Sequence, residues 1–146
     1  MERHENAKLF KEIILEIFKL HGQLNTIGDK LTQEFELSSA RWKVLGAIFL
    51  AESSQTVPQI AKSMGQSRQA IQKIITAMHK QGFLLVGENP NHKTAKLISL
   101  TTKGKEVFLK LDEKQIEWSN ACSENLDRVK LQSTIEVLKE ISSDFD

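Results

Sequence analysis

The sequence predicts a mostly α-helical protein with a small β-wing, in which a winged helix-turn-helix lobe is flanked by long helices. Three features predict this fold: two short helical segments joined at Gly65, strand-like patterning after Gly82, and apolar stripes near both ends of the chain. The 146 residues contain no linker long enough to divide them. We therefore expect a single domain over 1–146, with the lobe at about 38–101 and flanking helices at about 6–32 and 102–143.

The first part of the chain is expected to form two helices. Apolar residues recur every three or four positions over Asn6–Leu24, which predicts an amphipathic helix that continues beyond this range. A second helix is expected to begin within Leu37–Trp42, where Ser38 or Ser39 caps its first amides. The polar stretch Ala51–Gln55 is then predicted to be a loop.

Two helix-start signals and two glycines define the helix-turn-helix. Thr56 and Gln59 have the spacing of a capping box, in which each side chain bonds a backbone amide of the other residue. Gly65 is placed to end this short helix in a left-handed conformation, and Ser67 is placed to cap the next helix. Gly82 is expected to end the second helix. Two helices joined by a short turn that contains Gly are typical of a helix-turn-helix.

A β-hairpin is predicted directly after the helix-turn-helix. Phe83–Val86 and Leu97–Leu100 are short β-prone runs, and the turn-rich segment Glu88–Lys93, interrupted by Pro90, separates them. A hairpin in this position is a wing.

The apolar surfaces of the end helices predict a homodimer. Thr101 or Thr102 is expected to cap a long helix, and Asp127 to cap a last helix after a break near Asn125. The first and last helices carry more apolar surface than a small winged-helix core covers. Pairing of these surfaces about a two-fold axis is the economical interpretation. The alternative is that both stripes close on the core of their own chain.

Basic residues are concentrated in one part of the chain. The formal net charge of the whole chain is only +1, but Lys62–Lys103 carries +6 and the remainder carries −5. Glu88 is the one acidic residue in this basic segment. Such a block suits a polyanion, and a solvated surface is the alternative interpretation. Its place on the predicted helix-turn-helix and wing favours nucleic acid.

The outward face of the second helix in the helix-turn-helix carries side chains suited to DNA. In this motif the second helix lies in the major groove and its N-terminal residues meet base edges. Arg and Lys bind guanine O6 and N7, Gln binds adenine N6 and N7, and a Ser at the helix start suits a phosphate. No acidic residue lies between Lys62 and Gly87. We therefore predict a face for double-stranded DNA made of Ser67, Arg68, Gln69, Gln72, Lys73 and Thr76.

The wing tip is predicted to reach the flanking minor groove, where a cation senses the negative potential. Lys93 is the leading candidate for this contact, with His92 beside it and Lys96 on the flank of the hairpin. Lys62 is predicted to touch the DNA backbone. For Lys62 and Lys96, simple solubility explains the charge equally well.

Several stretches resemble the multiple-antibiotic-resistance regulator (MarR) family of bacterial winged-helix dimers, and the likeness covers most of the chain. The resemblance implies a dimer held by the N- and C-terminal helices, palindromic operators, and repression relieved by a small ligand. Such ligands usually bind between the dimer helices and the DNA-binding lobe. The stretches are Leu37–Leu45, Thr56–Ala61, Met64–Lys73, Asn89–Lys93 and Leu97–Gly104.

The wing departs from the pattern that is commonest in this family, Asp-Pro-x-Asp-x-Arg, in which an acid steadies a minor-groove Arg. Asn89, Pro90 and His92 stand at the first, second and fourth places, and Lys93 replaces Arg as the basic residue of the tip. A similar Asn-Pro-x-His-basic wing occurs in one branch of the family. Lys lacks the flat fork of Arg, so reading of the minor groove is expected to be weaker. Protonation of His92 would add positive charge to this wing.

Effector and metal sites have weaker signals. A pocket lined by Phe18, Trp42 and Trp118 is the candidate effector site, although core packing explains the same aromatics equally well. Cys122, the only cysteine, is expected to be a buried inert thiol rather than an oxidant sensor. The four histidines lack ligand spacing, so neither a metal nor another cofactor is expected.

Three other functions are alternatives to that of a site-specific regulator. No phosphate loop, nucleophile elbow or paired catalytic carboxylates are present in the sequence, so an enzyme is not expected. A sequence-tolerant architectural DNA-binding protein remains an alternative. A winged-helix module that binds protein would be expected to carry apolar or acidic residues where this chain has Arg68, Gln69, Gln72 and Lys73.

The N-terminus has no pattern of a secretory signal, and no apolar run is long enough for a bilayer. A cytoplasmic location without membrane contact is therefore expected.

Overall fold

The computed structural model describes residues 1–2 and 4–146. The described chain is mostly helical and has one two-stranded antiparallel sheet, which is the fold class that the sequence predicts. Backbone contacts divide it into two compact units, 1–111 and 112–146. The division falls within helix α5 (Thr102–Ser123).

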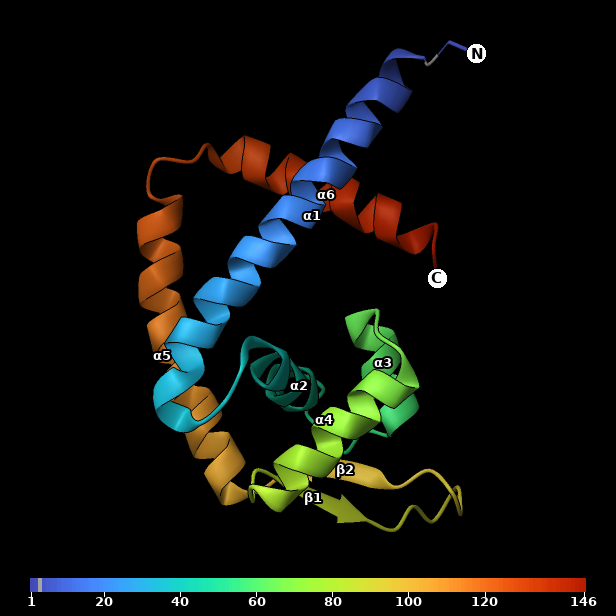
Figure 1. The fold of residues 1–146 in the computed structure, drawn as a ribbon, viewed down its shortest axis with the longest axis vertical. Helices are drawn as coiled ribbons and strands as arrows, with labels where there is room; N and C mark the ends of the chain where they lie inside the picture. The colour runs from blue at the N-terminus through green and yellow to red at the C-terminus, as the bar shows by residue number, and fades with distance from the viewer. Residues whose placement is uncertain (3) are drawn as a thin grey trace. The chain divides into compact units, whose positions relative to one another are not determined.

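The first unit begins with a long helix that buries little of its surface. Helix α1 (Glu5–Thr32) confirms the predicted amphipathic helix, and its N-terminal half extends away from helices α2 to α4 (Figure 1). A short 3-10 helix, η1 (Gln33–Phe35), follows it, and Glu36 with φ of 56° ends this turn. The sequence did not predict η1, because a Glu residue with a left-handed backbone conformation is uncommon and no local sequence pattern indicates it. Helix α2 (Ser39–Leu50) then begins after Ser38, whose side chain accepts a hydrogen bond from Arg41 N at 3.2 Å.

The helix-turn-helix consists of α3 (Val57–Met64) and α4 (Arg68–Lys80). The capping box is confirmed: Thr56 N donates to Gln59 Oε1 at 2.9 Å, and Gln59 N donates to Thr56 Oγ1 at 3.4 Å. Gly65 has φ of 63°, a left-handed conformation that glycine adopts without strain. Ser67 then caps α4 by accepting from Ala70 N at 3.1 Å. The predicted turn between the two helices is therefore confirmed.

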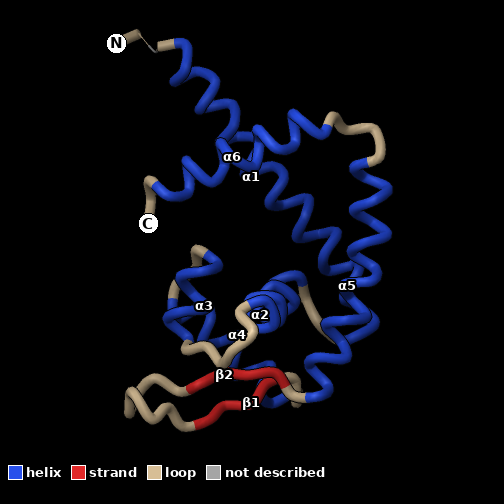
Figure 2. Tube along the Cα trace, turned by 180° about the vertical axis from the view of Figure 1, so that it is seen from behind, coloured by secondary structure: helices blue, strands red, loops and turns tan. Residues whose placement is uncertain are grey.

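The wing is a hairpin whose second strand is bonded on both edges. Strand β1 (Leu84–Gly87) pairs antiparallel with β2 (Leu97–Leu100), and the connecting loop extends beyond both strands (Figure 2). Gln55 lies on the other edge of β2: its N donates to Ile98 O at 3.0 Å and its O accepts from Ile98 N at 2.7 Å. The segment predicted as a loop therefore joins the sheet at its last residue. A bridge of one residue has no alternating pattern by which the sequence could reveal it.

The base of the wing is fixed to the start of α5 through Thr101. Its hydroxyl donates to Gly82 O at 2.6 Å and accepts from Gly104 N at 3.0 Å, and its backbone N donates to Phe83 O at 3.1 Å. A Cβ atom at Gly104 would overlap the carbonyl oxygen of Phe83, so only glycine allows this close approach.

The hydrophobic core of the first unit lies among α2, α3, α4, the sheet and the first turns of α5. Phe108 on α5 packs against Phe49 on α2, with ring centroids 4.4 Å apart. The buried apolar side chains are those of Leu37, Val44, Leu45, Ile48, Ile60, Ala61, Ile71, Ile75, Met78, Phe83, Leu84, Ile98, Leu100, Phe108 and Leu111.

The second unit contains the end of α5 and helix α6 (Arg128–Ser143). Asp127 caps α6 as predicted, accepting from Lys130 N at 2.9 Å. No residue of α6 is buried. Cys122 is exposed, so the expectation of a buried thiol is wrong: the described part of the chain leaves the last turn of α5, where it lies, exposed.

Among the described residues, no helix combines the length and apolar character that a bilayer crossing requires.

Candidate nucleic-acid interface

One groove of the first unit lies between α4, the start of α3 and the wing. Its volume is about 1130 Å³. The buried side chains of Ile75 and Ile98 contribute to its lining, and polar side chains of α4 and the wing surround them. Every formally charged residue among its described lining is basic, namely Arg68 and Lys96. The groove is therefore an apolar hollow with a polar, basic border.

The outward face of α4 offers unoccupied donors and acceptors. Arg68, Gln69 and Lys73 are exposed, and within the described chain their side chains have no hydrogen bond or ion pair. Thr76 Oγ1 donates to Gln72 O at 2.9 Å and accepts from Gln72 Nε2 at 3.2 Å, which holds these two side chains together. Unpaired side chains on a rigid helix are free to exchange their water for a ligand.

The structure brings together only some of the predicted DNA-binding residues. Arg68, Gln69, Gln72, Thr76 and His92 line the groove. The other predicted residues are exposed but do not line it; these are Lys62, Ser67, Lys73 and Lys93.

His79 also lines the groove and was not selected from the sequence. It lies three residues after Thr76 and seven after Gln72, so helical spacing places all three on one face. Its Nδ1 lies 3.0 Å from Leu84 O, and because a carbonyl oxygen only accepts a hydrogen bond, Nδ1 of the neutral ring carries the hydrogen and donates it. The other ring nitrogen, Nε2, is then a hydrogen-bond acceptor on the surface of α4.

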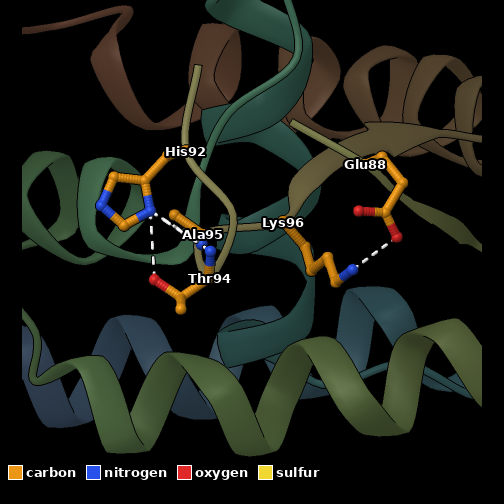
Figure 3. A network of polar contacts seen from close by, with 5 residues as sticks. All are labelled: Glu88, His92, Thr94, Ala95 and Lys96. Carbon is orange, nitrogen blue, oxygen red and sulfur yellow. Dashed lines mark hydrogen bonds and ion pairs between the residues drawn. The ribbon is translucent and has the colours of Figure 1, made fainter. Parts of the chain in front are cut away.

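Lys96 is the one predicted wing cation with a partner in the described chain. Its Nζ lies 2.5 Å from Glu88 Oε1, and both side chains are largely exposed (Figure 3). This ion pair offsets the charge of Lys96, whereas the ammonium group of Lys93 has no ion pair or hydrogen bond with a described residue. Lys93 is therefore the cation available at the wing tip.

The wing tip is built from two consecutive turns closed by side chains. Asn89 Oδ1 accepts from Asn91 N at 3.0 Å, and Asn89 O accepts from His92 N at 3.2 Å. His92 Nδ1 then accepts from Ala95 N at 3.2 Å and from Thr94 N at 3.4 Å (Figure 3). Lys93 lies inside the second turn.

Comparison with known proteins fixes the type of this winged-helix fold. No family model matches the chain. An uncharacterized protein of Mycobacterium tuberculosis is 28% identical over 127 residues, which are 87% of this chain and 87% of that protein. The crystal structure of a MarR/EmrR family transcriptional regulator from Acinetobacter sp. matches with a TM-score of 0.83 over 94% of this chain and 97% of that one, at 18% identity.

The chain has the MarR winged-helix fold.

Another protein with a similar fold was crystallised with DNA. The S. aureus MepR–DNA complex matches with a TM-score of 0.78 at 14% identity, and the match covers 89% of this chain and 94% of that one.

The wing pattern of the sequence places two side chains that are in contact in the structure. In the six-residue pattern Asp-Pro-x-Asp-x-Arg, the fourth place is His92 and the sixth is Thr94. Thr94 Oγ1 lies 3.1 Å from His92 Nδ1. The side chains at these two places therefore still pair, but without a carboxylate or a guanidinium group.

The three aromatics predicted to line an effector pocket do not line the groove of this MarR fold. Trp42 is partly buried and packs against the core, whereas Phe18 is 70% exposed on α1. Trp118 belongs to the second unit. An effector role for these residues remains a prediction.

Proposed function

We propose that this chain is a sequence-specific transcription regulator that binds double-stranded DNA. In this proposal α4 enters the major groove and the wing enters the flanking minor groove. The observation that carries it is the face of α4, where Arg68, Gln69 and Lys73 are exposed and unpaired within the described chain. Arg and Gln at the start of such a helix suit the edges of guanine and adenine.

The charge and chemistry around α4 support DNA over a protein partner. Arg68 in the lining of the groove and Lys93 at the wing tip are basic and unpaired among described residues, whereas Glu88 offsets the charge of Lys96. DNA carries one negative charge for about every 1.7 Å of duplex, so a polar face with clustered bases complements it. The complex of MepR with DNA is a further support, because it has the same fold.

We propose that the regulator is a homodimer. Helix α6 buries no residue, and most of its large apolar side chains are exposed. Helix α1 is similarly exposed along its first half. Exposed stripes of this extent usually meet a partner, and a second copy of the chain offers an identical surface. The exposed apolar residues are Leu9, Phe10, Leu15, Phe18, Leu20 and Leu24 on α1, and Val129, Leu131, Ile135, Val137 and Leu138 on α6.

A dimer with two copies of α4 would favour a palindromic operator, with half-sites about one helical turn apart. Repression relieved by a small effector is the remaining part of the proposal, and the resemblance to the MarR family is its support. Binding of an effector to the dimer would release DNA only if the effector prefers a conformation that DNA does not.

The proposal is tested by selecting bound sequences from a pool of random duplexes, with the mass of the protein measured on the same sample. We expect an enriched near-palindrome and a dimer mass. Salt-sensitive binding without enrichment would instead indicate an architectural DNA-binding protein. No binding at any salt concentration would contradict the proposal and favour a winged-helix module for protein partners. The selected duplex then serves as the probe for effectors that release it.

Lys93→Ala is expected to reduce the salt dependence of binding to the selected duplex. Each phosphate contact contributes about 0.9 to the slope of log K against log salt concentration, so the slope should fall by about this amount for each bound copy of the wing. Lys96→Ala is the matched control, because Glu88 already offsets the charge of Lys96 and a smaller change is expected. Titrations at several salt concentrations measure both slopes. An unchanged slope for Lys93→Ala would show that Lys93 contacts no phosphate.

A further inference from the structure

We propose that His92 is a positioning residue of the wing: its unprotonated Nδ1 closes the turn that carries Lys93, and the DNA contact of Lys93 depends on this acceptor. The part of this inference that concerns DNA rests on the proposed function. The part that concerns the turn does not, because all of its contacts lie within the free protein.

The hydrogen bonds of the tip determine which nitrogen of His92 carries the proton. Two backbone amides, Thr94 N and Ala95 N, lie 3.4 and 3.2 Å from Nδ1. A backbone amide only donates, so Nδ1 has to offer its lone pair, and the hydrogen of the neutral ring is on Nε2. The hydroxyl of Thr94, 3.1 Å from the same nitrogen, then also acts as a donor. Figure 3 shows Nδ1 at the meeting point of these contacts and the other ring nitrogen turned away from them.

The turn at His92 is similar to the turn in which an Asn or Asp side chain accepts a hydrogen bond from the backbone just after it. In such a turn a side-chain oxygen attached to Cγ accepts from the amide two residues later. Nδ1 of His92 is also attached to Cγ and accepts from the amides two and three residues later. Asn89 forms the oxygen version of the same turn three positions earlier. His92 is therefore placed to close a turn as Asn89 does, but its acceptor is a ring nitrogen, which no longer accepts once it is protonated.

The second turn fixes the backbone of Lys93. Lys93 is the residue directly after His92, and the amides that Nδ1 holds belong to the two residues that follow Lys93. A flexible loop would have to lose backbone freedom on binding, at a cost in free energy for each residue that becomes ordered. A turn that is already closed in the free protein avoids much of this cost. The contact of the Lys93 ammonium group with DNA then contributes more to the affinity for DNA.

Protonation of His92 has two opposite effects. The imidazolium ion carries hydrogens on both nitrogens, so protonation removes the Nδ1 acceptor. The added charge meanwhile attracts phosphate. The other charged or titratable groups of this region are Arg68 and His79 on α4, and Lys93, Lys96 and Glu88 on the wing. Because these effects on affinity oppose each other, the turn has to be observed directly.

The turn is tested by NMR spectroscopy of the free protein labelled with ¹⁵N. At pH 8 we expect the His92 ring to show the Nε2–H tautomer, with slowed hydrogen exchange at the amides of Thr94 and Ala95. In His92→Ala at the same pH, exchange at these two amides should become faster while the amide of Asn91, held by Asn89 Oδ1, keeps its rate. An Nδ1–H tautomer at pH 8, or unchanged exchange of the two amides in His92→Ala, would overturn the inference.

The link to Lys93 is tested by a double-mutant cycle at pH 8 on the selected duplex. His92→Ala is expected to weaken binding by about 2- to 10-fold, the size of one net hydrogen bond. In the Lys93→Ala background, the same change should cost less than about twofold, because the turn no longer positions a cation. His92→Asn retains an acceptor on Cγ and is expected to bind within about twofold of wild type, with the exchange of Ala95 N still slow.

Two results would contradict the link. Additive losses in the cycle would show that His92 acts independently of Lys93, and equal losses for His92→Asn and His92→Ala would show that the ring itself contacts DNA. If the wild-type protein bound no DNA, the proposed function and the role of Lys93 would both fail, and the NMR measurement would still decide whether His92 closes the turn.

Discussion

Arg68→Ala is expected to weaken binding to the selected duplex by about 1–3 kcal/mol, or roughly 5- to 150-fold, and to relax the sequence preference at one position of each half-site. Arg68 is the first residue of α4, directly after the Ser67 cap, and its guanidinium group has no partner among the described residues. The side chain therefore has two parallel donors available for guanine O6 and N7. Titration and a repeated sequence selection with the variant measure the two effects.

Two variants separate base reading from general charge. Arg128→Ala is the matched control, because Arg128 is also the first residue of a capped helix, follows Asp127, and is exposed outside the groove. It is expected to leave the sequence preference unchanged. Arg68→Lys retains the charge without the fork and should keep most of the salt dependence while losing selectivity. If Arg68→Ala left both affinity and preference intact, the assignment of α4 as the reading helix would be wrong.

Ile71→Ala is expected to lower the free energy of unfolding by about 2–5 kcal/mol. Ile71 is fully buried on the inner face of α4, within the core formed with α2 and the sheet. Removal of its side chain leaves a cavity, and the surrounding residues relax only partly. Denaturant unfolding at one fixed protein concentration measures the change, because a dimer is stabilised as its concentration rises.

The size of the Ile71 effect has internal controls. Ile71→Val removes one methylene group and should cost about 0.5–1.5 kcal/mol. Leu50→Ala, at the end of α2 where Leu50 is 76% exposed, is expected to change stability by less than about 0.5 kcal/mol. A loss below about 1 kcal/mol for Ile71→Ala would mean that α4 is not packed on the core as described.

The sequence predicted the helix-turn-helix well because its signals are local. The Thr56 and Ser67 caps act on amides within the next three residues. Gly65 is itself the residue that adopts the left-handed conformation, so its identity indicates where the helix ends. The outward face of α4 follows from the period of the helix alone. The same period could have added His79 to the candidate residues.

The features that the sequence did not predict depend on contacts between segments far apart in the chain, or on the position of a single side-chain atom. The bridge between Gln55 and Ile98 joins residues more than 40 positions apart, and no composition signals it. The role of Nδ1 in His92 depends on where two amides point, which only the folded turn fixes. The aromatics Phe18, Trp42 and Trp118 were grouped by type, and residue type gives no distance between them.

The bridge at Ile98 anchors the base of the wing. Strand β2 is clamped on one edge by β1 and on the other by Gln55, directly before the first turn of α3. The tip that carries Lys93 lies in the loop beyond Gly87 and Leu97, outside the part of the wing that these hydrogen bonds hold. A displacement of this tip would reach the segment that enters α3 through the two hydrogen bonds at Ile98.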